Sequence, residues 1–517
     1  MKKNINTEIQ ILINRYNNGE FNDVLKKISL LVKDFPKNDF LWNLSGLSFQ
    51  KIGNIRDSIT SFQNAIQANT KNYAAHNNLA LSLKYSKDYR EAERILKELL
   101  KNNPNYLNAI VNLANLKNDT YFFEEAITLY ERAIKIEPNS SQIYVNIAHI
   151  LQTQNKIKEA KAFLVKALKI NQNFARADEL LSRLTNYKDS KNDEHLSEML
   201  NKLKNSNLDE DSKARLHFSL GKGFEDKKEY EKSFHHLQEA NYLRSKKSRS
   251  SIEFCKKKAG DLKKFFSSFN LNSLKVNKND KKKIFILGLP RSGTTLLEKI
   301  ISSHSKVSTV SEIGFVFDEI TKNIISNGLI DENKINNFIQ TDLNKKYQST
   351  LDNFNVKNEF IIDKTLTNFW YIGFLKIFFP NSKIIHSYRN PKDNCLSIYK
   401  NYIPTNEKWP FDQKEMSEYF LIYQDLMEFW NQLFKDQIYN SKYENLIRDK
   451  EKHIREIIKF CGLEWDDNCL NHHKNNNPIK TLSINQANKP IYESSINSSK
   501  FYEKKLSKLF NNLEDLN

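Results

Sequence analysis

The N-terminal part of the chain repeats its pattern of small and apolar positions every 34 residues. Four separate positions keep this register. Small residues let paired helices cross closely, and a proline ends one helix before the next begins. The pattern predicts an α-solenoid of five helix pairs over residues 5–173. The four sets are Gly46, Ala80, Ala114 and Ala148; Ser58, Ala92, Ala126 and Ala160; Ala65, Leu99, Ala133 and Ala167; and Pro36, Thr70, Pro104, Pro138 and Gln172.

A sixth match, near residues 214–244, follows a polar insertion at 188–211 and extends the predicted solenoid to 5–250. Period and small-residue positions are typical of tetratricopeptide (TPR) repeats. Such solenoids usually present a concave groove to a peptide or protein, so we expect a protein or peptide partner. The alternative is a scaffold that only stabilises or dimerises the rest of the chain. The sixth match consists of Gly221, Phe224, Ser233, Leu237 and Ala240.

Buried strands alternate with helices in the second half, which predicts a parallel sheet with ligands at the carboxyl ends of its strands. The most informative segment is a strand at 284–287, a loop from Gly288 to Gly293 and the start of a helix. Its spacing is nearly that of a nucleoside-triphosphate P-loop, but Thr294 replaces the lysine and Arg291 lies inside the loop. A triphosphate–Mg²⁺ enzyme would lack its clamp here, whereas one phosphate-like group needs only the helix N-terminus.

The loop resembles that of sulfotransferases that use 3′-phosphoadenosine-5′-phosphosulfate (PAPS). The resemblance is strongest to the tyrosylprotein sulfotransferases and to bacterial proteins that join such a domain to TPR repeats, and it covers residues 281–510. The predicted fold is therefore a TPR α-solenoid followed by a P-loop-like α/β sulfotransferase domain. The resemblance implies that the loop holds the 5′-phosphosulfate through Arg291, Ser292, Gly293, Thr294 and Thr295.

The resemblance also implies catalytic residues. Glu312 lies 21 residues beyond Arg291, as does the family's proton-accepting glutamate. A phenol has a pKa of about 10, so a positioned carboxylate helps it to attack sulfur. By residue type alone, Asp318 and Glu319 are alternatives. Lys364, after a buried strand, resembles the lysine that stabilises charge on the leaving group, and Arg291 and Ser483 are implied transition-state contacts.

Arg389 at a strand end and Ser397 eight residues later resemble the family's 3′-phosphate site. A further arginine of that site is replaced by Asn401, and Lys400 is the candidate substitute. A lysine of the late loop is also out of register: Ser498 occupies its position, and Lys500 comes two residues late. Further implied cofactor contacts are Tyr443, Ser483, Gln486, Lys489 and Pro490.

Composition narrows the function classes. A net charge of +18 would suit nucleic acid, but no recognised nucleic-acid motif is present and no such partner is expected. The four cysteines show no metal spacing, and no metal is expected. The longest apolar run, 368–379, is too short to span a bilayer, and no secretory signal is visible. We therefore expect a cytoplasmic protein without a transmembrane segment; a homodimer is left open.

Taken together, the sequence predicts transfer of a sulfuryl group from PAPS to a hydroxyl, with Glu312 as general base and protein tyrosine as the favoured acceptor. A carbohydrate or small-molecule hydroxyl is the nearest alternative. A non-catalytic TPR scaffold with a nucleotide-binding domain is the alternative from another class. We also expect a chain that lacks residues 1–250 to keep nucleotide binding.

Overall fold

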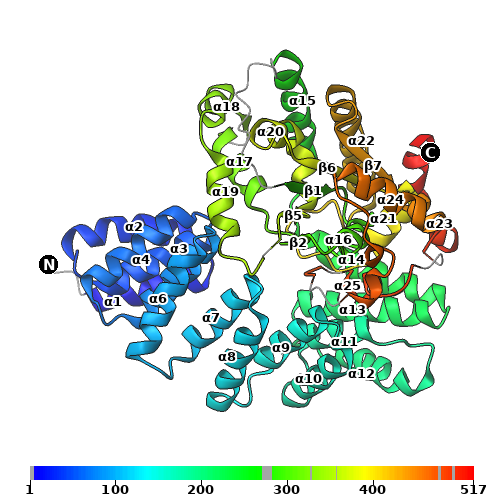
Figure 1. Ribbon diagram of the computed structural model, residues 1–517. Coiled ribbons are helices and arrows are strands. Elements are labelled where there is room, and N and C mark those ends of the chain that lie inside the picture. The colour runs from blue at the N-terminus through cyan, green and yellow to red at the C-terminus, as the bar shows by residue number, and fades with distance from the viewer. Residues whose placement is uncertain are drawn as a thin grey trace. The chain divides into compact units, whose positions relative to one another are not determined.

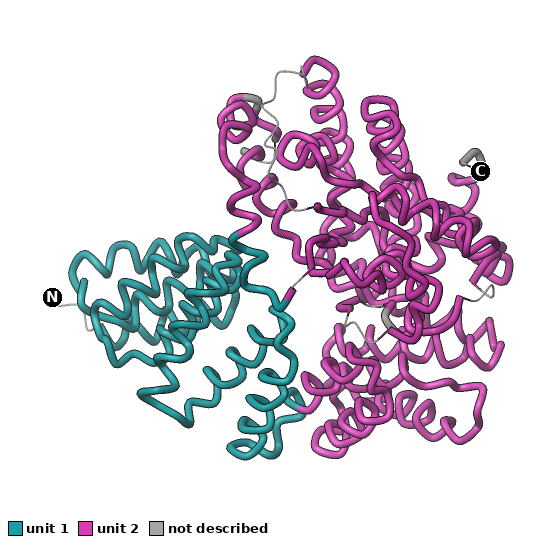
Figure 2. Tube along the Cα trace, in the orientation of Figure 1, with its two compact units in different colours: residues 1–143, 349–355 teal, residues 144–348, 356–517 magenta. Residues whose placement is uncertain are grey.

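The computed structural model describes residues 5–269, 282–326, 329–356, 358–475, 479–481, 483–491 and 495–516 (Figure 1). The chain forms two compact units (Figure 2). The first contains residues 1–143 and 349–355, and the second contains residues 144–348 and 356–517. The predicted boundary near 250–281 lies inside the second unit; its first part forms α15 (Ile252–Ser268), and residues 270–281 lie outside the described residues.

The first unit consists of antiparallel helix pairs, as the 34-residue period predicts. Small residues lie where paired helices cross: a Cβ on Gly46 would come 2.5 Å from the Phe62 ring of the partner helix. Asparagine and aspartate side chains cap several N-termini; for example, Asn38 accepts from the Leu41 N–H at 3.1 Å. The helices are α1 (Ile5–Asn17), α2 (Phe21–Asp34), α3 (Asp39–Lys51), α4 (Ile55–Ala68), α5 (Tyr73–Tyr85), α6 (Tyr89–Asn102), α7 (Leu107–Asp119) and α8 (Phe123–Ile136).

A short segment from the second half of the sequence, Ser349–Asn355, also belongs to the first unit. Phe354 is buried there, with its ring centroid 5.6 Å from that of Tyr89 and 5.9 Å from that of Tyr121. The Asn355 N–H donates to the Thr120 carbonyl at 3.1 Å. The segment is therefore packed on the repeats by an aromatic anchor and a backbone hydrogen bond.

Helices also form the first part of the second unit in the sequence. Helix α9 begins in the first unit and ends in the second, and with α10 it completes the predicted five pairs within the described residues 5–170. The polar insertion contains α12, whose Leu196 and Met199 pack with Tyr187 and Leu216 into a small core. These helices are α9 (Ser141–Thr153), α10 (Ile157–Ile170), α11 (Ala175–Leu184), α12 (Asp193–Leu203), α13 (Glu210–Asp226), α14 (Tyr230–Lys247) and α15 (Ile252–Ser268).

The rest of the second unit is built on a five-stranded, all-parallel sheet in the order β2-β5-β1-β6-β7. The predicted parallel sheet is thus confirmed. A separate antiparallel pair, β3 (Ile325–Ser326) and β4 (Leu329–Ile330), lies outside it. The five strands are β1 (Lys283–Leu287), β2 (Val307–Thr309), β5 (Phe360–Asp363), β6 (Lys383–Tyr388) and β7 (Ile438–Lys442).

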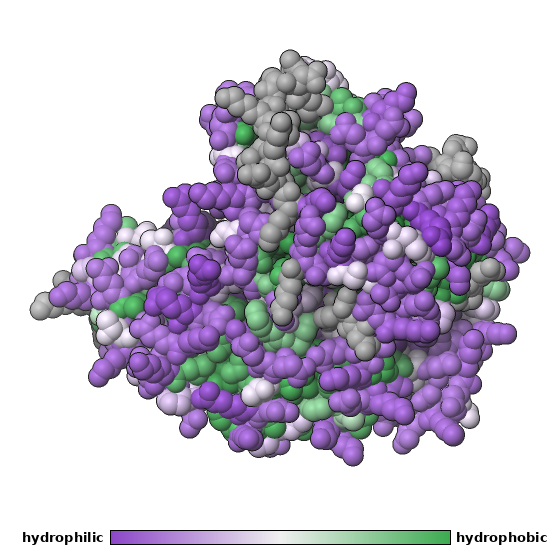
Figure 3. Space-filling view, in the orientation of Figure 1, coloured by the Kyte–Doolittle hydropathy of each residue, from purple (hydrophilic) through white to green (hydrophobic). Residues whose placement is uncertain are grey.

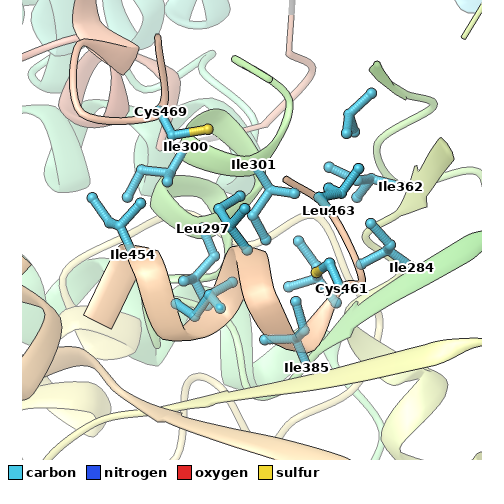
Figure 4. Packing of buried hydrophobic residues seen from close by; sticks show 14 of the residues in the cluster. Ile284, Leu297, Ile300, Ile301, Ile362, Ile385, Ile454, Cys461, Leu463 and Cys469 are labelled. Atoms are coloured by element: carbon cyan, nitrogen blue, oxygen red, sulfur yellow. The ribbon is translucent and has the colours of Figure 1, made fainter. Parts of the chain in front are cut away.

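Helices pack against both faces of this sheet because its strands are apolar on both sides. On one face, Ile284 and Ile385 pack with Leu297 of α16 and Ile454 of α24 (Figure 4). On the other face, the Phe285 ring lies 5.4 Å from that of Phe379. The helices are α16 (Thr294–Ile301), α17 (Phe315–Ile324), α18 (Glu332–Ile339), α19 (Leu343–Leu351), α20 (Ile372–Phe378), α21 (Pro391–Tyr399), α22 (Gln413–Leu433), α23 (Tyr443–Arg448), α24 (Lys450–Phe460), α25 (Ile484–Ala487) and α26 (Ser507–Phe510).

Hydrophilic side chains predominate on the face shown in Figure 3, with smaller hydrophobic areas between them. This agrees with a composition of 80 lysines and arginines and 62 acidic residues. Within the described residues, none of the helices combines the length and the apolar character that crossing a bilayer requires.

Candidate active site

The loop between β1 and α16 approaches other backbone and side chains so closely that two positions require glycine. Gly288 has φ +146°, and a Cβ there would lie 2.2 Å from the Ser387 carbonyl oxygen. Gly293 has φ +104°, and a Cβ there would lie 2.7 Å from Cδ2 of Tyr443. The glycines let the loop close tightly before α16, whose N-terminal N–H groups and dipole favour an anion.

Arg291 lies inside this loop in a left-handed conformation, with φ +68°. Its Nε donates to Ser397 Oγ at 3.1 Å, its Nη2 donates to Gln486 Oε1 at 2.8 Å, and its Nη1 donates to Ser483 Oγ. The Arg291 guanidinium thus connects to three further residues that the sequence predicted for the same site, from two other segments of the chain. The oxygens of these three side chains are uncharged.

Arg389 follows β6 and is 8% exposed. Its Nη2 donates to the Ser495 carbonyl, its Cζ lies 4.9 Å from the centre of the Tyr443 ring, and Asp393 Oδ2 is 3.8 Å from Nη2. Among the described residues, its buried Nε has no hydrogen-bond partner, and neither has the buried Oγ of Ser292. Unpaired buried polar atoms are uncommon and call for an explanation, such as a ligand that would pair with them.

These residues surround a cavity of about 420 Å³, a volume typical of small-molecule sites. We call the lining residues from the α/β part of the unit the α/β wall. They include every predicted cofactor contact except Ser292, which lies between the lining residues Arg291 and Gly293. The structure therefore brings the predicted cofactor set together. The lining residues from that prediction are Arg291, Gly293, Thr294, Thr295, Arg389, Ser397, Tyr443, Ser483, Gln486, Lys489 and Pro490.

The opposite wall comes from α11 and α13, which sequence reasoning assigned to the solenoid and not to the site. We call it the helical wall. On it, Lys222 donates to Asp226 at 2.6 Å, and burial lowers the pKa of Lys222. Arg183 donates to Glu179 at 2.5 Å. The helical wall consists of Glu179, Ser182, Arg183, Phe218, Ser219, Lys222, Glu225 and Asp226.

The helical wall is held to the α/β part by the chain that follows α21. The Tyr402 hydroxyl donates to Asp211 Oδ1 at 2.8 Å and accepts from Arg215 Nη2 at 2.8 Å. The Arg215 guanidinium also stacks on the Tyr402 ring, with Cζ 3.9 Å from its centre. Asn241 of α14 donates to the Tyr399 carbonyl at 2.9 Å. Helices α13 and α14 therefore support the end of the helix that carries Ser397.

Lys364 follows β5 and is fully buried between two carboxylates. Its Nζ donates to Glu312 Oε1 and lies 3.6 Å from Glu298 Oε2. Burial alone would lower the pKa of Lys364, but the two carboxylates raise it above its ordinary value. Glu298 is also buried, which raises the pKa of its carboxyl, and it accepts from Thr309 and Ser311 at 2.6 Å each. These groups fix the lysine in position.

Sequence reasoning missed Glu298, although a lone acid in the apolar first turns of α16 is a signal for it.

Glu312 has a side chain that is 44% exposed, so a reactant can reach it. Glu319 instead lies 3.6 Å from Lys346 and 3.9 Å from Lys322. Within the described part of the chain, Glu312 and Lys364 are not among the residues that line the cavity; they lie at the same carboxyl edge of the sheet.

The two proposed substitutes for missing basic contacts differ in position. Lys400 lines the cavity, and its Nζ lies 2.7 Å from Glu225 Oε1. Lys500 lies over the Phe501 ring at 5.1 Å and does not belong to the described lining residues. Asn401 and Ser498 also line the cavity.

Comparison with known families identifies both parts of the chain. Residues 283–467 match the model of the sulfotransferase family, and residues 123–184 match a tetratricopeptide repeat model. The chain therefore carries a sulfotransferase-family domain together with TPR repeats, as its sequence predicts. The match supports a sulfotransferase.

Individual relatives cover only parts of the chain. An uncharacterized protein of Aquifex aeolicus (strain VF5) is 32% identical over 338 residues, which are 62% of this chain and 44% of that protein. Protein-tyrosine sulfotransferase 1 of Danio rerio is 24% identical over 220 residues, 39% of this chain and 59% of that protein. The chain thus spans less than two thirds of either relative. A tetratricopeptide repeat protein from Parabacteroides merdae is 16% identical over 46% of this chain and 91% of that chain, with a TM-score of 0.36.

Proposed function

We propose that this protein transfers the sulfuryl group of PAPS to a hydroxyl acceptor, and that the favoured acceptor is a tyrosine of a protein. One observation carries the proposal. One cavity is lined by Arg291, Arg389, Ser397 and Ser483. Among the described residues, the buried Nε of Arg389 has no hydrogen-bond partner. A nucleotide with two anionic groups would pair with such a set, because arginine holds phosphate through a permanent, forked charge.

The residues present fit that ligand at both ends. The Gly loop and the first turn of α16, with Thr294 and Thr295, would hold the 5′ end through N–H and hydroxyl donors. Arg389 and Ser397 would hold the 3′-phosphate, and Tyr443 would lie beside the ligand. Further contacts would come from Ser292, Gly293, Gln486, Lys489 and Pro490. When bound, PAPS would supply the sulfuryl group.

The chain's own residues would then prepare the acceptor. Glu312 would accept the hydroxyl proton at a carboxylate oxygen, since its side chain is half-exposed and held by Lys364. Lys364, Arg291 and Ser483 would stabilise negative charge on the leaving side. Glu298 would keep Lys364 in place through the 3.6 Å ion pair.

The acceptor class is inferred from a relative and from the repeats. Similarity to a protein-tyrosine sulfotransferase and the repeats of the first unit favour a protein, because TPR grooves commonly bind peptides. A cytoplasmic setting and the oligomeric state stay predictions from the sequence.

The nucleotide is tested by thermal unfolding of the purified full chain. Adenosine 3′,5′-bisphosphate, the product of transfer, is expected to raise the melting temperature without magnesium, because a ligand that binds only the folded state stabilises it. Adenosine 5′-monophosphate at equal concentration is the matched control and should raise it less. Stabilisation by ATP–Mg²⁺ but not by the bisphosphate would contradict the proposal.

The acceptor is tested by incubating the chain with radiolabelled PAPS and host lysate. Label on tyrosine of a protein is the expected result. Label on a glycan or a small molecule would replace the acceptor class and keep the reaction. Bisphosphate binding without any transfer would instead favour a non-catalytic scaffold.

A further inference from the structure

The C-terminal end of α21 and the two residues after it present three side chains to the cavity. Ser397 lies in the helix, and the C-cap Lys400 and then Asn401 follow at i+3 and i+4, so the helical spacing brings them to the same side of the helix end. The Asn401 amide donates back to the Ser397 carbonyl at 2.8 Å. Lys400 is therefore the cation that this turn contributes beside Ser397.

Lys400 does not point freely into solvent. Its side chain is 19% exposed, and its Nζ lies 2.7 Å from Glu225 of α13, whose side chain is 28% exposed. The ammonium also lies 5.8 Å from the centre of the Tyr502 ring. Glu225 is thus a carboxylate from the helical wall that determines where the cation of α21 lies.

This pair differs from an ordinary surface ion pair, which contributes little. Both members line the cavity and are mostly buried, and the same cavity is lined by Arg389, whose Nε is unpaired within the described residues. An ammonium has three donors. Among the described residues, Glu225 is the group that accepts from it, which leaves donors for an anion in the cavity.

We propose that Lys400 binds the 3′-phosphate of the nucleotide and that Glu225 is its positioning residue. Helix α13, a member of the repeat-like pair, is then part of the nucleotide site. The proposal rests on the proposed function and adds two residues to it. Lys500, which lies beside Phe501, takes no part.

The test measures dissociation constants of the full chain for adenosine 3′,5′-bisphosphate and adenosine 5′-monophosphate by calorimetry. Lys400→Met keeps the length of the side chain and removes its charge. It is expected to weaken the bisphosphate about tenfold or more, the scale of a hydrogen bond to a charged group, and the monophosphate less than about threefold. Lys400→Arg keeps the charge and should retain the preference for the bisphosphate.

Lys392 supplies the matched control, because it lies on the same helix but pairs with Glu503 at 3.5 Å, away from the cavity lining. Lys392→Met should leave both constants unchanged. Glu225→Gln should change the ratio of the two constants at least about threefold in the wild-type background and not at all beside Lys400→Met, because its effect passes through that lysine. A merely structural role would weaken both nucleotides together.

The outcomes separate the two proposals. A wild-type chain that does not bind the bisphosphate would contradict the proposed function. A wild-type chain that prefers the bisphosphate, with a preference unchanged in Lys400→Met, would overturn this inference alone. A Lys400→Met chain that does not fold leaves Lys400→Arg and Glu225→Gln to decide: loss of the preference in Lys400→Arg, or an unchanged ratio in Glu225→Gln, would also overturn it.

Discussion

The two walls of the cavity hold their cations in different ways. On the α/β wall, the guanidinium of Arg291 donates to hydroxyl and amide oxygens of Ser397, Ser483 and Gln486. On the helical wall, Arg183 is paired with Glu179 and Lys222 with Asp226. Among the described residues, the α/β wall also has a buried donor without a partner, the Nε of Arg389, and such an atom calls for a ligand. This donor and the N-terminus of α16 favour the α/β wall as the anion site.

The largest expected effect concerns chemistry at the carboxyl edge of the sheet. Glu312→Gln keeps size and polarity but removes the basic oxygen, so kcat is expected to fall about 10²–10⁴-fold. Bisphosphate affinity should stay near that of the wild type, because Glu312 lies outside the described cavity lining. Rapid-quench measurement of sulfate transfer checks this.

Glu319→Gln is the matched control for that substitution, since Glu319 pairs with lysines elsewhere. It should leave kcat unchanged. A Glu312→Gln enzyme that keeps more than about a tenth of wild-type kcat, with chemistry rate-limiting, would move the base to Asp318 or Glu319.

The next effect tests the walls directly. Arg389→Ala is expected to weaken bisphosphate binding by about 1.5–3 kcal/mol, because a charged hydrogen bond would be lost. Arg183→Ala, which removes a cation already paired with a carboxylate, should change binding by less than about 0.5 kcal/mol. Calorimetry on both variants measures the contrast. Equal losses would show that the pairing on the helical wall does not neutralise its cations.

The α/β wall could be predicted from the sequence because its signals are local. Gly288 and Gly293 are required by contacts of 2.2 and 2.7 Å to a hypothetical Cβ, and such positions appear in the sequence as a spaced glycine motif. The strands are visible in the sequence as continuous apolar runs, the pattern expected of a parallel sheet that has helices on both faces. Arg389 directly follows β6 and Ser397 lies in α21, the next helix, so the family resemblance names both from one short segment.

The helical wall could not be predicted, since its charged residues have the spacing of an ordinary solvated helix face. Only the tertiary packing shows that Glu225 meets Lys400, 175 residues later in the chain. The same holds for Phe354, an isolated aromatic residue that packs on the repeats. Glu298 is different: a buried acid in an apolar helix was visible in the sequence.

Removing the first repeats tests how far the helical side is needed. Residues 144–268 belong to the second unit, and α11 and α13 line the cavity, so deletion of 1–250 would remove one wall. We therefore expect deletion of 1–143, not of 1–250, to preserve bisphosphate affinity. If the repeats recruit a protein acceptor, its KM should rise about tenfold, which corresponds to about 1.4 kcal/mol of lost binding.

The deletion uncovers Phe354, so the shortened chain carries Phe354→Ser, and the full chain with Phe354→Ser is the matched control. A shortened chain that is folded and has an unchanged KM would favour the scaffold role for the repeats. Loss of bisphosphate affinity in that folded chain would show that the nucleotide site depends on the first unit.

The smallest expected effect concerns a buried cation of α15 that lies among aromatic rings. Lys258 is 6% exposed, and its Nζ lies 4.4 Å from the ring centres of Trp370 and Tyr371 and 5.3 Å from that of Phe317. Within the described residues it makes no ion pair. Burial lowers the pKa of Lys258 to about 7, although Cys255 and Glu407 act in the opposite direction.

The pH dependence follows from that lowered pKa. Between about pH 7 and pH 10.5, the unfolded chain binds the lysine proton while the folded chain has released it, so the free energy of unfolding should rise with pH in this window. The wild type should gain about 1 kcal/mol over Lys258→Met between pH 7 and pH 8, because one pKa unit corresponds to about 1.4 kcal/mol. Urea unfolding at both pH values measures the gain. Lys256→Met, on the same helix but with a side chain that is 47% exposed, should follow the wild type, and parallel curves for Lys258→Met would show that this cation keeps its proton among the rings.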